Sequence, residues 1–209
     1  MCKELLLLHG LGQTPEDWSA VCAALPDSSS VRCPALFALP RSGALTYDAL
    51  YRAFCALCDD SPAPLSLCGL SLGAILALHY GLEHPGRVGA LALAAPQYKM
   101  PRTLMALQNI LFRLMPARTF SSLGLPKTDL LCLTRSMASL DFTDRLDRLT
   151  CPTLILCGDR DKANRAAAET LAAQLSQAEF YLVPQAGHEL NRDAPAALAS
   201  RLAAFFQLQ

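Results

Sequence analysis

The junction around Ser71 constrains the fold more than any other feature of the sequence. The apolar run Leu65–Cys68 has the length of a buried strand, and the following Leu72–His84 has the length and apolar content of a helix. Between them, Gly69 and Gly73 stand two positions on either side of Ser71. Glycines there allow a turn so tight that the serine hydroxyl projects above the strand. The same segment also fits an ordinary glycine-flanked helix cap, because serine is a good N-cap residue.

Apolar runs of strand length alternate with stretches of helix length along most of the chain. This alternation is typical of an α/β fold, in which helices cover both faces of a mostly parallel sheet. The sequence predicts six strands, at Glu4–Leu8, Ser30–Cys33, Leu65–Cys68, Gly89–Ala94, Thr153–Cys157 and Glu179–Val183. It also predicts helices from Pro15 to about Leu25 and over Tyr47–Cys58, Leu72–His84, Arg165–Ser176 and Pro195–Phe206.

One segment, residues 98–140, does not follow the alternating pattern. It has helical apolar spacing and no strand pattern, so we interpret it as a small helical cap inserted in the fold. The whole chain of 209 residues is 52% hydrophobic, which is enough apolar material for one core. We therefore expect residues 1–209 to form a single domain.

Three other motifs also follow predicted strands. His9-Gly10-Leu11-Gly12 follows the first strand, Gly158-Asp159-Arg160-Asp161 closes the fifth, and Ala186-Gly187-His188-Glu189 follows the sixth. A serine is a weak nucleophile unless a neutral imidazole takes its proton, and a carboxylate can hold that imidazole in the correct tautomer. Asp159 and Asp161 also fit a second interpretation, as loop carboxylates that cap the helix beginning near Asn164.

These motifs, met in the order serine, aspartate and histidine, resemble those of the α/β-hydrolase family over nearly the whole chain. The resemblance implies that Ser71 is a nucleophile, Asp161 an orienting acid and His188 a general base. It also implies an oxyanion hole formed by the backbone N–H groups of Leu11 and Leu72. Asp159 is then a turn former.

The chain departs from the family pattern near its first strand. Most members carry an antiparallel hairpin before the strand that ends in the His-Gly motif, whereas here that strand begins near residue 4. The sheet is therefore expected to have six parallel strands with Ser30–Cys33 at one edge. An exposed edge can pair with a second copy of the chain, so monomer and homodimer are both open.

The candidate substrate-binding residues come from the oxyanion loop, which is the segment His9-Gly10-Leu11-Gly12, and from the predicted cap. They are His9, Gly10, Met100, Met105 and Met115. Flexible thioethers suit an adaptable apolar pocket for an acyl or alkyl group. Gap filling in a small helical core explains the methionines equally well.

Charge is segregated onto the same segment, which holds six lysines and arginines but only one acidic residue, Asp129. This surplus would attract a substrate that bears a carboxylate or a phosphate. A solvated helical face is the alternative and the default.

The overall composition excludes several classes of function. The formal net charge is zero, so no basic field favours nucleic acid or an anionic membrane as a partner. No apolar stretch reaches the roughly 20 residues that cross a bilayer, and no export signal is visible. Nine cysteines, mostly in apolar periodic segments, suit the reducing cytoplasm. The four histidines do not form a metal-site pattern with carboxylates, and no cofactor is expected.

The leading functional hypothesis is a serine hydrolase that cleaves a carboxylic ester of a small, partly apolar molecule through an acyl-enzyme intermediate. Two alternatives stay open. The same three residues can serve a carbon–carbon bond hydrolase or a lyase, and the fold can serve as a sensor of a small ligand that hydrolyses it slowly.

Overall fold

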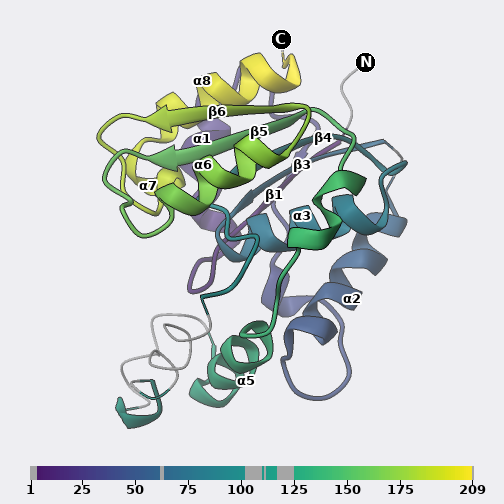
Figure 1. Cartoon of the computed structure of the whole chain (residues 1–209), viewed down its shortest axis with the longest axis vertical. Coiled ribbons are helices and arrows are strands. Elements are labelled where there is room, and N and C mark those ends of the chain that lie inside the picture. Colours follow the sequence, from purple (N-terminus) through teal and green to yellow (C-terminus); the bar gives the residue numbers. More distant parts are fainter. Residues whose placement is uncertain (1–3, 62–63, 102–109, 111, 117–124, 209) are drawn as a thin grey trace.

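A computed structural model describes residues 4–61, 64–101, 110, 112–116 and 125–208. Its centre is a six-stranded parallel sheet with the order β2-β1-β3-β4-β5-β6 (Figure 1). The strands are β1 (Leu5–Leu8), β2 (Val31–Arg32), β3 (Leu65–Leu70), β4 (Val88–Ala94), β5 (Thr153–Gly158) and β6 (Ala178–Val183). The predicted α/β fold and the position of the second strand at one edge are therefore confirmed.

Helices cover both faces of this sheet. The longer ones are α1 (Ser19–Ala24), α2 (Tyr47–Asp59), α3 (Leu72–Glu83), α5 (Lys127–Met137), α6 (Arg165–Gln174) and α8 (Pro195–Phe206). Short helical turns occur at η1 (Pro15–Trp18), η2 (Leu36–Ala38), η4 (Thr143–Arg148) and α7 (Leu190–Asp193). The predicted helix after Thr14 is present as η1 followed by α1, and α7 was not predicted.

The strands alternate their side chains between two hydrophobic clusters. Leu6 and Leu8 of β1 pack into the cluster beneath α2, α3 and α6, whereas Leu5 and Leu7 pack into the cluster beneath α1 and α8. All four leucines are completely buried. A short, continuous apolar run such as this one therefore forms a central strand because both of its faces are covered.

Much of the described part of residues 98–140 lies at one end of the molecule, whereas Met100 packs into the hydrophobic core. Helix α5 stands apart from the sheet and beside α2 (Figure 1). The division into one domain with a cap over 98–140 stays a prediction. In the described residues, no helix is both long and apolar enough to cross a membrane.

Candidate active site

Ser71 lies on a strained turn between β3 and α3. Its backbone angles are φ 53° and ψ −109°, a conformation that residues with a side chain rarely adopt. Ser71 is the N-cap residue of α3, yet its side chain makes no capping hydrogen bond. The interpretation of this serine as an ordinary helix cap is therefore wrong, and in the described part of the chain its hydroxyl has no hydrogen-bond partner.

The flanking glycines make this turn possible. A Cβ atom on Gly73 would lie 2.2 Å from the carbonyl oxygen of Leu8 in β1, and a Cβ on Gly69 would lie 2.2 Å from the backbone of Gly73. Neither contact is sterically possible, so α3 can pack against β1 only because both positions lack a side chain. The sequence spacing of the motif thus has a direct structural cause.

Asp161 and His188 are brought together from the loops after β5 and β6. His188 Nδ1 lies 2.8 Å from Asp161 Oδ2. The carboxylate is almost completely buried, with 4% of its side chain exposed, whereas the imidazole is 42% exposed. The backbone of Arg160 joins the two loops by donating to Ala186 O at 2.9 Å. Asp159 is exposed on the same loop, and its backbone donates to Val183 O.

Asn164 supplies the remaining hydrogen bonds to the buried carboxylate. Its Nδ2 lies 2.9 Å from both Asp161 oxygens, and its backbone N–H donates to Asp161 Oδ1 at 3.3 Å. Gln97, which follows β4, donates to Asn164 Oδ1 at 2.8 Å. Asp161 therefore caps the turn before α6 and also contacts His188, so the two interpretations of this residue are compatible.

Ser71 stands at the same edge of the sheet as this pair, at the carboxyl end of β3. Its backbone N–H donates to Ala94 O of β4, the strand between β3 and β5. Among the described residues, no hydrogen bond joins the Ser71 hydroxyl to His188. The structure thus brings Asp161 and His188 into contact and places Ser71 at the same edge of the sheet, two strands from β5.

The loop after β1 lies against Ser71. A Cβ atom on Gly10 would lie 3.6 Å from Ser71 Cβ. Gly10 N–H donates to Gln13 Oε1 at 3.1 Å, and Gln13 N–H returns to Gly10 O at 3.3 Å. Within the described residues, this turn leaves the Leu11 N–H without an acceptor. Leu72 is the first residue of α3, so its N–H also has no acceptor within the helix.

His9 holds this loop in place through hydrogen bonds of both ring nitrogens. It is buried, and its Nε2 accepts a hydrogen bond from the Leu36 N–H at 3.1 Å. Nδ1 therefore carries the proton and donates to Gly10 O at 2.9 Å. Burial lowers the pKa of His9, which favours this neutral form. His9 holds the loop in place and at the same time lines a pocket.

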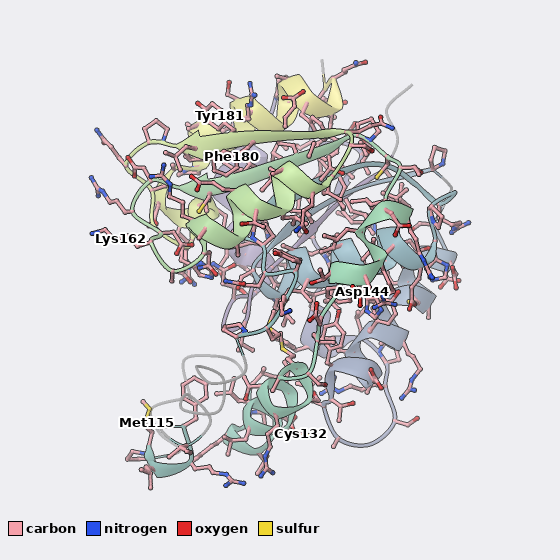
Figure 2. The ribbon with its side chains drawn as sticks, in the orientation of Figure 1. Met115, Cys132, Asp144, Lys162, Phe180 and Tyr181 are labelled. Atoms are coloured by element: carbon pink, nitrogen blue, oxygen red, sulfur yellow. The ribbon has the colours of Figure 1, made fainter. Side chains whose placement is uncertain are left out.

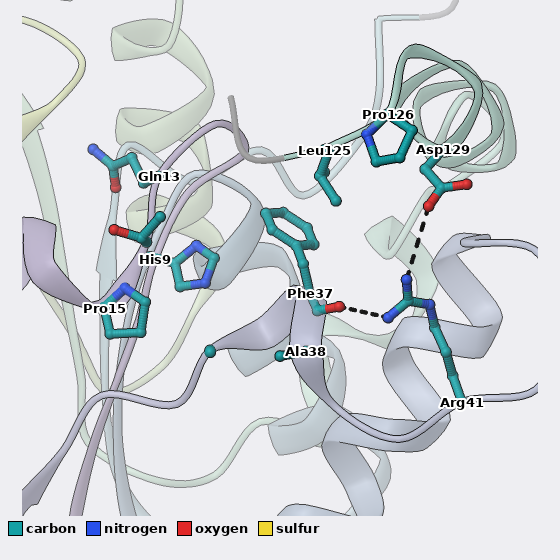
Figure 3. A pocket seen from close by; sticks show the side chains of 11 residues that line it. His9, Gln13, Pro15, Phe37, Ala38, Arg41, Leu125, Pro126 and Asp129 are labelled. Carbon is teal, nitrogen blue, oxygen red and sulfur yellow. Dashed lines mark hydrogen bonds and ion pairs between the residues drawn. The ribbon is translucent and has the colours of Figure 1, made fainter. Parts of the chain in front are cut away.

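That pocket has a volume of about 320 Å³ and lies between the loop after β1, the segment around η2 and the beginning of α5 (Figure 3). Its size is at the lower end of the range for small-molecule sites. The lining residues are His9, Gln13, Thr14, Pro15, Ala35, Phe37, Ala38, Arg41, Leu125, Pro126 and Asp129. We refer to it as the His9 pocket.

Met100 and Met115 do not line the His9 pocket. Met100 packs into the core and lines a different pocket, beside Lys99 and Asp141. Met115 lies at the end of the molecule remote from the sheet (Figure 2). Met105 lies outside the described residues. The described residues contain no group of three or more histidine, cysteine, aspartate or glutamate side chains arranged to hold a metal ion.

Sequence reasoning missed two polar pairs that support the site. Gln97 and Asn164 are one pair, and Gln13 and Asn191 are the other, with Gln13 Nε2 donating to Asn191 Oδ1 at 3.1 Å. Gln13, Asn164 and Asn191 each stand three residues after a predicted motif residue, namely Gly10, Asp161 and His188, and this proximity was the available signal. Gln97 follows β4, away from these motifs, and had no such signal.

Comparison with known proteins shows which family shares this architecture. A model of the alpha/beta hydrolase family matches residues 5–201. A pimeloyl-[acyl-carrier protein] methyl ester esterase of Aromatoleum aromaticum is 37% identical over 91 residues, which are 43% of this chain and 36% of that protein. A 2-succinyl-6-hydroxy-2,4-cyclohexadiene-1-carboxylate synthase of Klebsiella pneumoniae is 42% identical over 66 residues, 32% of this chain and 24% of that protein.

The matched segments thus span about a third or less of these relatives. Among solved structures, an esterase from Thermogutta terrifontis superposes with a TM-score of 0.79 at 23% identity and covers 97% of this chain and 89% of its own. That likeness shows the same fold. Since the family model matches nearly the entire sequence, the chain belongs to the alpha/beta hydrolase family.

Proposed function

We propose that the chain is a serine esterase in which Ser71 is the nucleophile, His188 the general base and Asp161 the orienting acid. The observation that carries the proposal is the 2.8 Å contact between His188 Nδ1 and the buried Asp161 carboxylate. Ser71 stands at the same edge of the sheet, and its hydroxyl makes no capping hydrogen bond. The similarity to an esterase supports the same chemistry.

The first half of the reaction follows from these positions. Asp161 accepts a hydrogen bond from the Nδ1–H of His188, which leaves Nε2 unprotonated and able to take a proton. Nε2 takes the Ser71 proton as Oγ attacks the ester carbonyl carbon. The carbonyl oxygen becomes negative, and the Leu11 and Leu72 N–H groups donate to it. The imidazolium then gives its proton to the departing alkoxide, which leaves as an alcohol. The acyl group stays on Ser71 Oγ as the acyl-enzyme.

The second half repeats these steps with water. Neutral His188 takes a proton from a water molecule, whose oxygen attacks the acyl carbon. The second tetrahedral intermediate collapses, the Ser71 oxygen recovers its proton from His188, and the carboxylic acid leaves. This cycle needs no cofactor. The 42% exposure of His188 lets water reach the imidazole without a further conformational change.

The test is hydrolysis of p-nitrophenyl esters of increasing acyl length by the wild-type chain, Ser71→Ala and Asp161→Asn. Sustained turnover that Ser71→Ala abolishes, together with fluorophosphonate labelling of Ser71, is the expected result. Asp161→Asn should keep the fold and lose about 10⁴ in kcat, because the amide favours the wrong imidazole tautomer. Turnover that survives in Ser71→Ala would contradict the proposal.

A second candidate is a carbon–carbon lyase or hydrolase that uses the same three residues. It is favoured by the similarity to the Klebsiella pneumoniae synthase. A folded wild-type chain that is labelled at Ser71 and yet turns over no ester would support this candidate. A ligand sensor would instead show a single turnover followed by a stable acyl-enzyme.

A further inference from the structure

An arginine at the rim of the His9 pocket has hydrogen-bond donors that no described residue of the protein uses. Arg41 Nη1 donates to the carbonyl oxygen of Phe37 at 2.5 Å. Its Nη2 lies 3.9 Å from Asp129 Oδ2, which is too long for a hydrogen bond (Figure 3). In the part of the chain that the structure describes, its Nε is buried and has no hydrogen-bond partner.

The pair of Arg41 and Asp129 is the loosest ion pair of the described residues. The others have nitrogen–oxygen distances from 2.5 to 3.3 Å. Both side chains are largely buried, with 20% of Arg41 and 31% of Asp129 exposed. A charge in such a place is stabilised by close hydrogen bonds, and with the described residues this guanidinium makes only one.

Two of the Arg41 donors that have no partner among the described residues, Nε–H and one Nη2–H, lie on one edge of the guanidinium. Nε–H and Nη2–H point in the same direction, and this edge binds a carboxylate with two parallel hydrogen bonds. Asp129 faces the edge from α5 without closing on it. A carboxylate that takes the place of Asp129 next to Nη2 can therefore also accept from Nε–H.

The remainder of the pocket suits an apolar chain. Phe37, Leu125 and Pro126 lie between the rim and the loop after β1 (Figure 3). At the inner end are His9 and Gln13, which belong to the same turn as Gly10, whose added Cβ would lie 3.6 Å from Ser71 Cβ. The pocket thus begins at the oxyanion loop and ends at a cation.

We propose that the His9 pocket binds a carboxylate-bearing ester, with Arg41 holding the carboxylate and Asp129 occupying that place when no substrate is bound. This inference rests on the proposed function and names its substrate class. Asp129 is then a competitor of the substrate, so the two charged residues have opposite effects on the preference for an anion.

The experiment compares p-nitrophenyl hemiesters of dicarboxylic acids with p-nitrophenyl alkanoates of the same chain length, each corrected for uncatalysed hydrolysis. The measured quantity is the ratio of kcat/KM for the anionic ester to kcat/KM for the neutral one. Arg41→Met should lower this ratio by about tenfold or more, the size of a lost charge-assisted contact. Arg41→Lys should lower it less, because an ammonium keeps the charge and loses the bidentate edge. Asp129→Asn should raise the ratio severalfold.

Arg52→Met is the matched control, because Arg52 is an exposed arginine of α2 that does not line the His9 pocket. It makes the same change of net charge and should leave the ratio unaltered. An unaltered ratio in Arg41→Met, or a lower one in Asp129→Asn, overturns the inference.

A binding measurement separates this inference from the proposed function. Calorimetric titration of Ser71→Ala with glutarate monomethyl ester needs no turnover. Arg41→Met in that background should abolish the binding, and Asp129→Asn should strengthen it. Suppose that neutral esters are hydrolysed through Ser71, but Arg41→Met changes neither the kcat/KM ratio nor the binding. The esterase proposal would then stand, and the carboxylate inference would be refuted.

Discussion

Asn164 and Asp161 are paired through both carboxylate oxygens, each of which lies 2.9 Å from Asn164 Nδ2. The same nitrogen lies 3.0 Å from His188 Nδ1. A nitrogen that faces two carboxylate oxygens is a donor, and the bond from Gln97 to Asn164 Oδ1 fixes the amide in this orientation. In the proposed mechanism, Asn164 is therefore a positioning residue for Asp161, the acid that orients His188.

Removing this positioning residue should slow the reaction without weakening substrate binding. Asn164→Ala frees the Asp161 carboxylate to rotate, and we expect kcat to fall by about tenfold to a hundredfold, as for other small misplacements of catalytic groups. KM should change little, because Asn164 does not line the His9 pocket. Steady-state kinetics on a neutral ester measure both quantities.

The pH profile distinguishes positioning from a structural role. Asn164→Asp places a second carboxylate beside the imidazole, which stabilises its protonated form, so the acid limb of kcat/KM should move to higher pH. Gln97→Ala should share the loss of kcat and leave that limb in place. If Asn164→Asp has the wild-type profile, Asn164 serves the fold alone.

The strain at Ser71 yields a prediction about stability. An alanine at this position keeps a Cβ atom at φ 53° and ψ −109°, whereas a glycine adopts these angles without strain. We expect the free energy of unfolding of Ser71→Gly to exceed that of Ser71→Ala by about 1 kcal/mol, although both variants are inactive. Urea unfolding of the two proteins measures the difference.

The control for this prediction is Ala166→Gly, at an exposed position of α6. In an ordinary helix the change from alanine to glycine destabilises by about 0.5–1 kcal/mol. The same chemical change should therefore have opposite signs at positions 71 and 166. Equal signs would mean that the turn at Ser71 stores no strain.

The sequence could predict the strands and the main helices because the apolar pattern of each element follows from which of its faces are buried. The run Leu5–Leu8 has no polar position, and four consecutive buried leucines are typical of a strand that is covered on both faces. The predicted bounds of Thr153–Cys157 and Pro195–Phe206 agree with the structure to within one residue. The glycine spacing around Ser71 was informative because close packing forbids a Cβ there.

The supporting polar contacts could not be predicted in this way. Gln97 and Asn164 are far apart in sequence and meet only because β4 and β5 are neighbours in the sheet. A loop glutamine or asparagine has the same local signature whether it faces solvent or a catalytic group. For Met100 the sequence left pocket lining and core filling equally open, and the residue packs into the core and also lines a pocket beside Lys99 and Asp141.

The buried His79 predicts a loss of stability in mild acid. It belongs to α3 and faces α2, where its Nδ1 is 3.2 Å from the Tyr47 hydroxyl, and its Nε2 is 3.1 Å from Glu83 Oε1. Burial lowers the pKa of His79 below its ordinary value of 6.5, although Glu83 acts in the opposite direction. Arg145, which also faces this cluster, lowers the pKa further, and the nearby Asp48 raises it.

The sign follows from proton binding. Below pH 6.5 the unfolded chain binds a proton at this histidine before the folded chain does, so the free energy of unfolding decreases as the pH falls. The decrease ends below the folded pKa, where both states are protonated. Urea unfolding between about pH 7.5 and about pH 5.5 should show this slope, and His79→Gln should reduce it. An identical slope in the variant would show that His79 contributes nothing to it.

The amide pair of Gln13 and Asn191 yields the last prediction. Asn191 is completely buried in α7, and its Nδ2 donates to Gln13 Oε1 at 3.2 Å and to Asp17 O at 3.2 Å. Gln13 Oε1 also accepts the Gly10 N–H. Through this pair, the turn that presents the Leu11 N–H is tied to the helix that begins just after His188.

Breaking the tie should affect stability and catalysis together. Asn191→Ala removes both hydrogen bonds between buried Gln13 and Asn191, although Gln13 keeps its contacts with Gly10 and Glu189, and we expect a cost of about 1–3 kcal/mol of unfolding free energy. It should also lower kcat, because the Leu11 N–H is no longer fixed relative to His188, while a fluorophosphonate should still label Ser71. Gln13→Ala should have the same two effects. Because each single change removes the same contact, the double variant should lose less stability than the sum of the two losses. Strictly additive losses would mean that Gln13 and Asn191 act independently and that the loop is held by its other bonds, such as the one from His9 to Gly10.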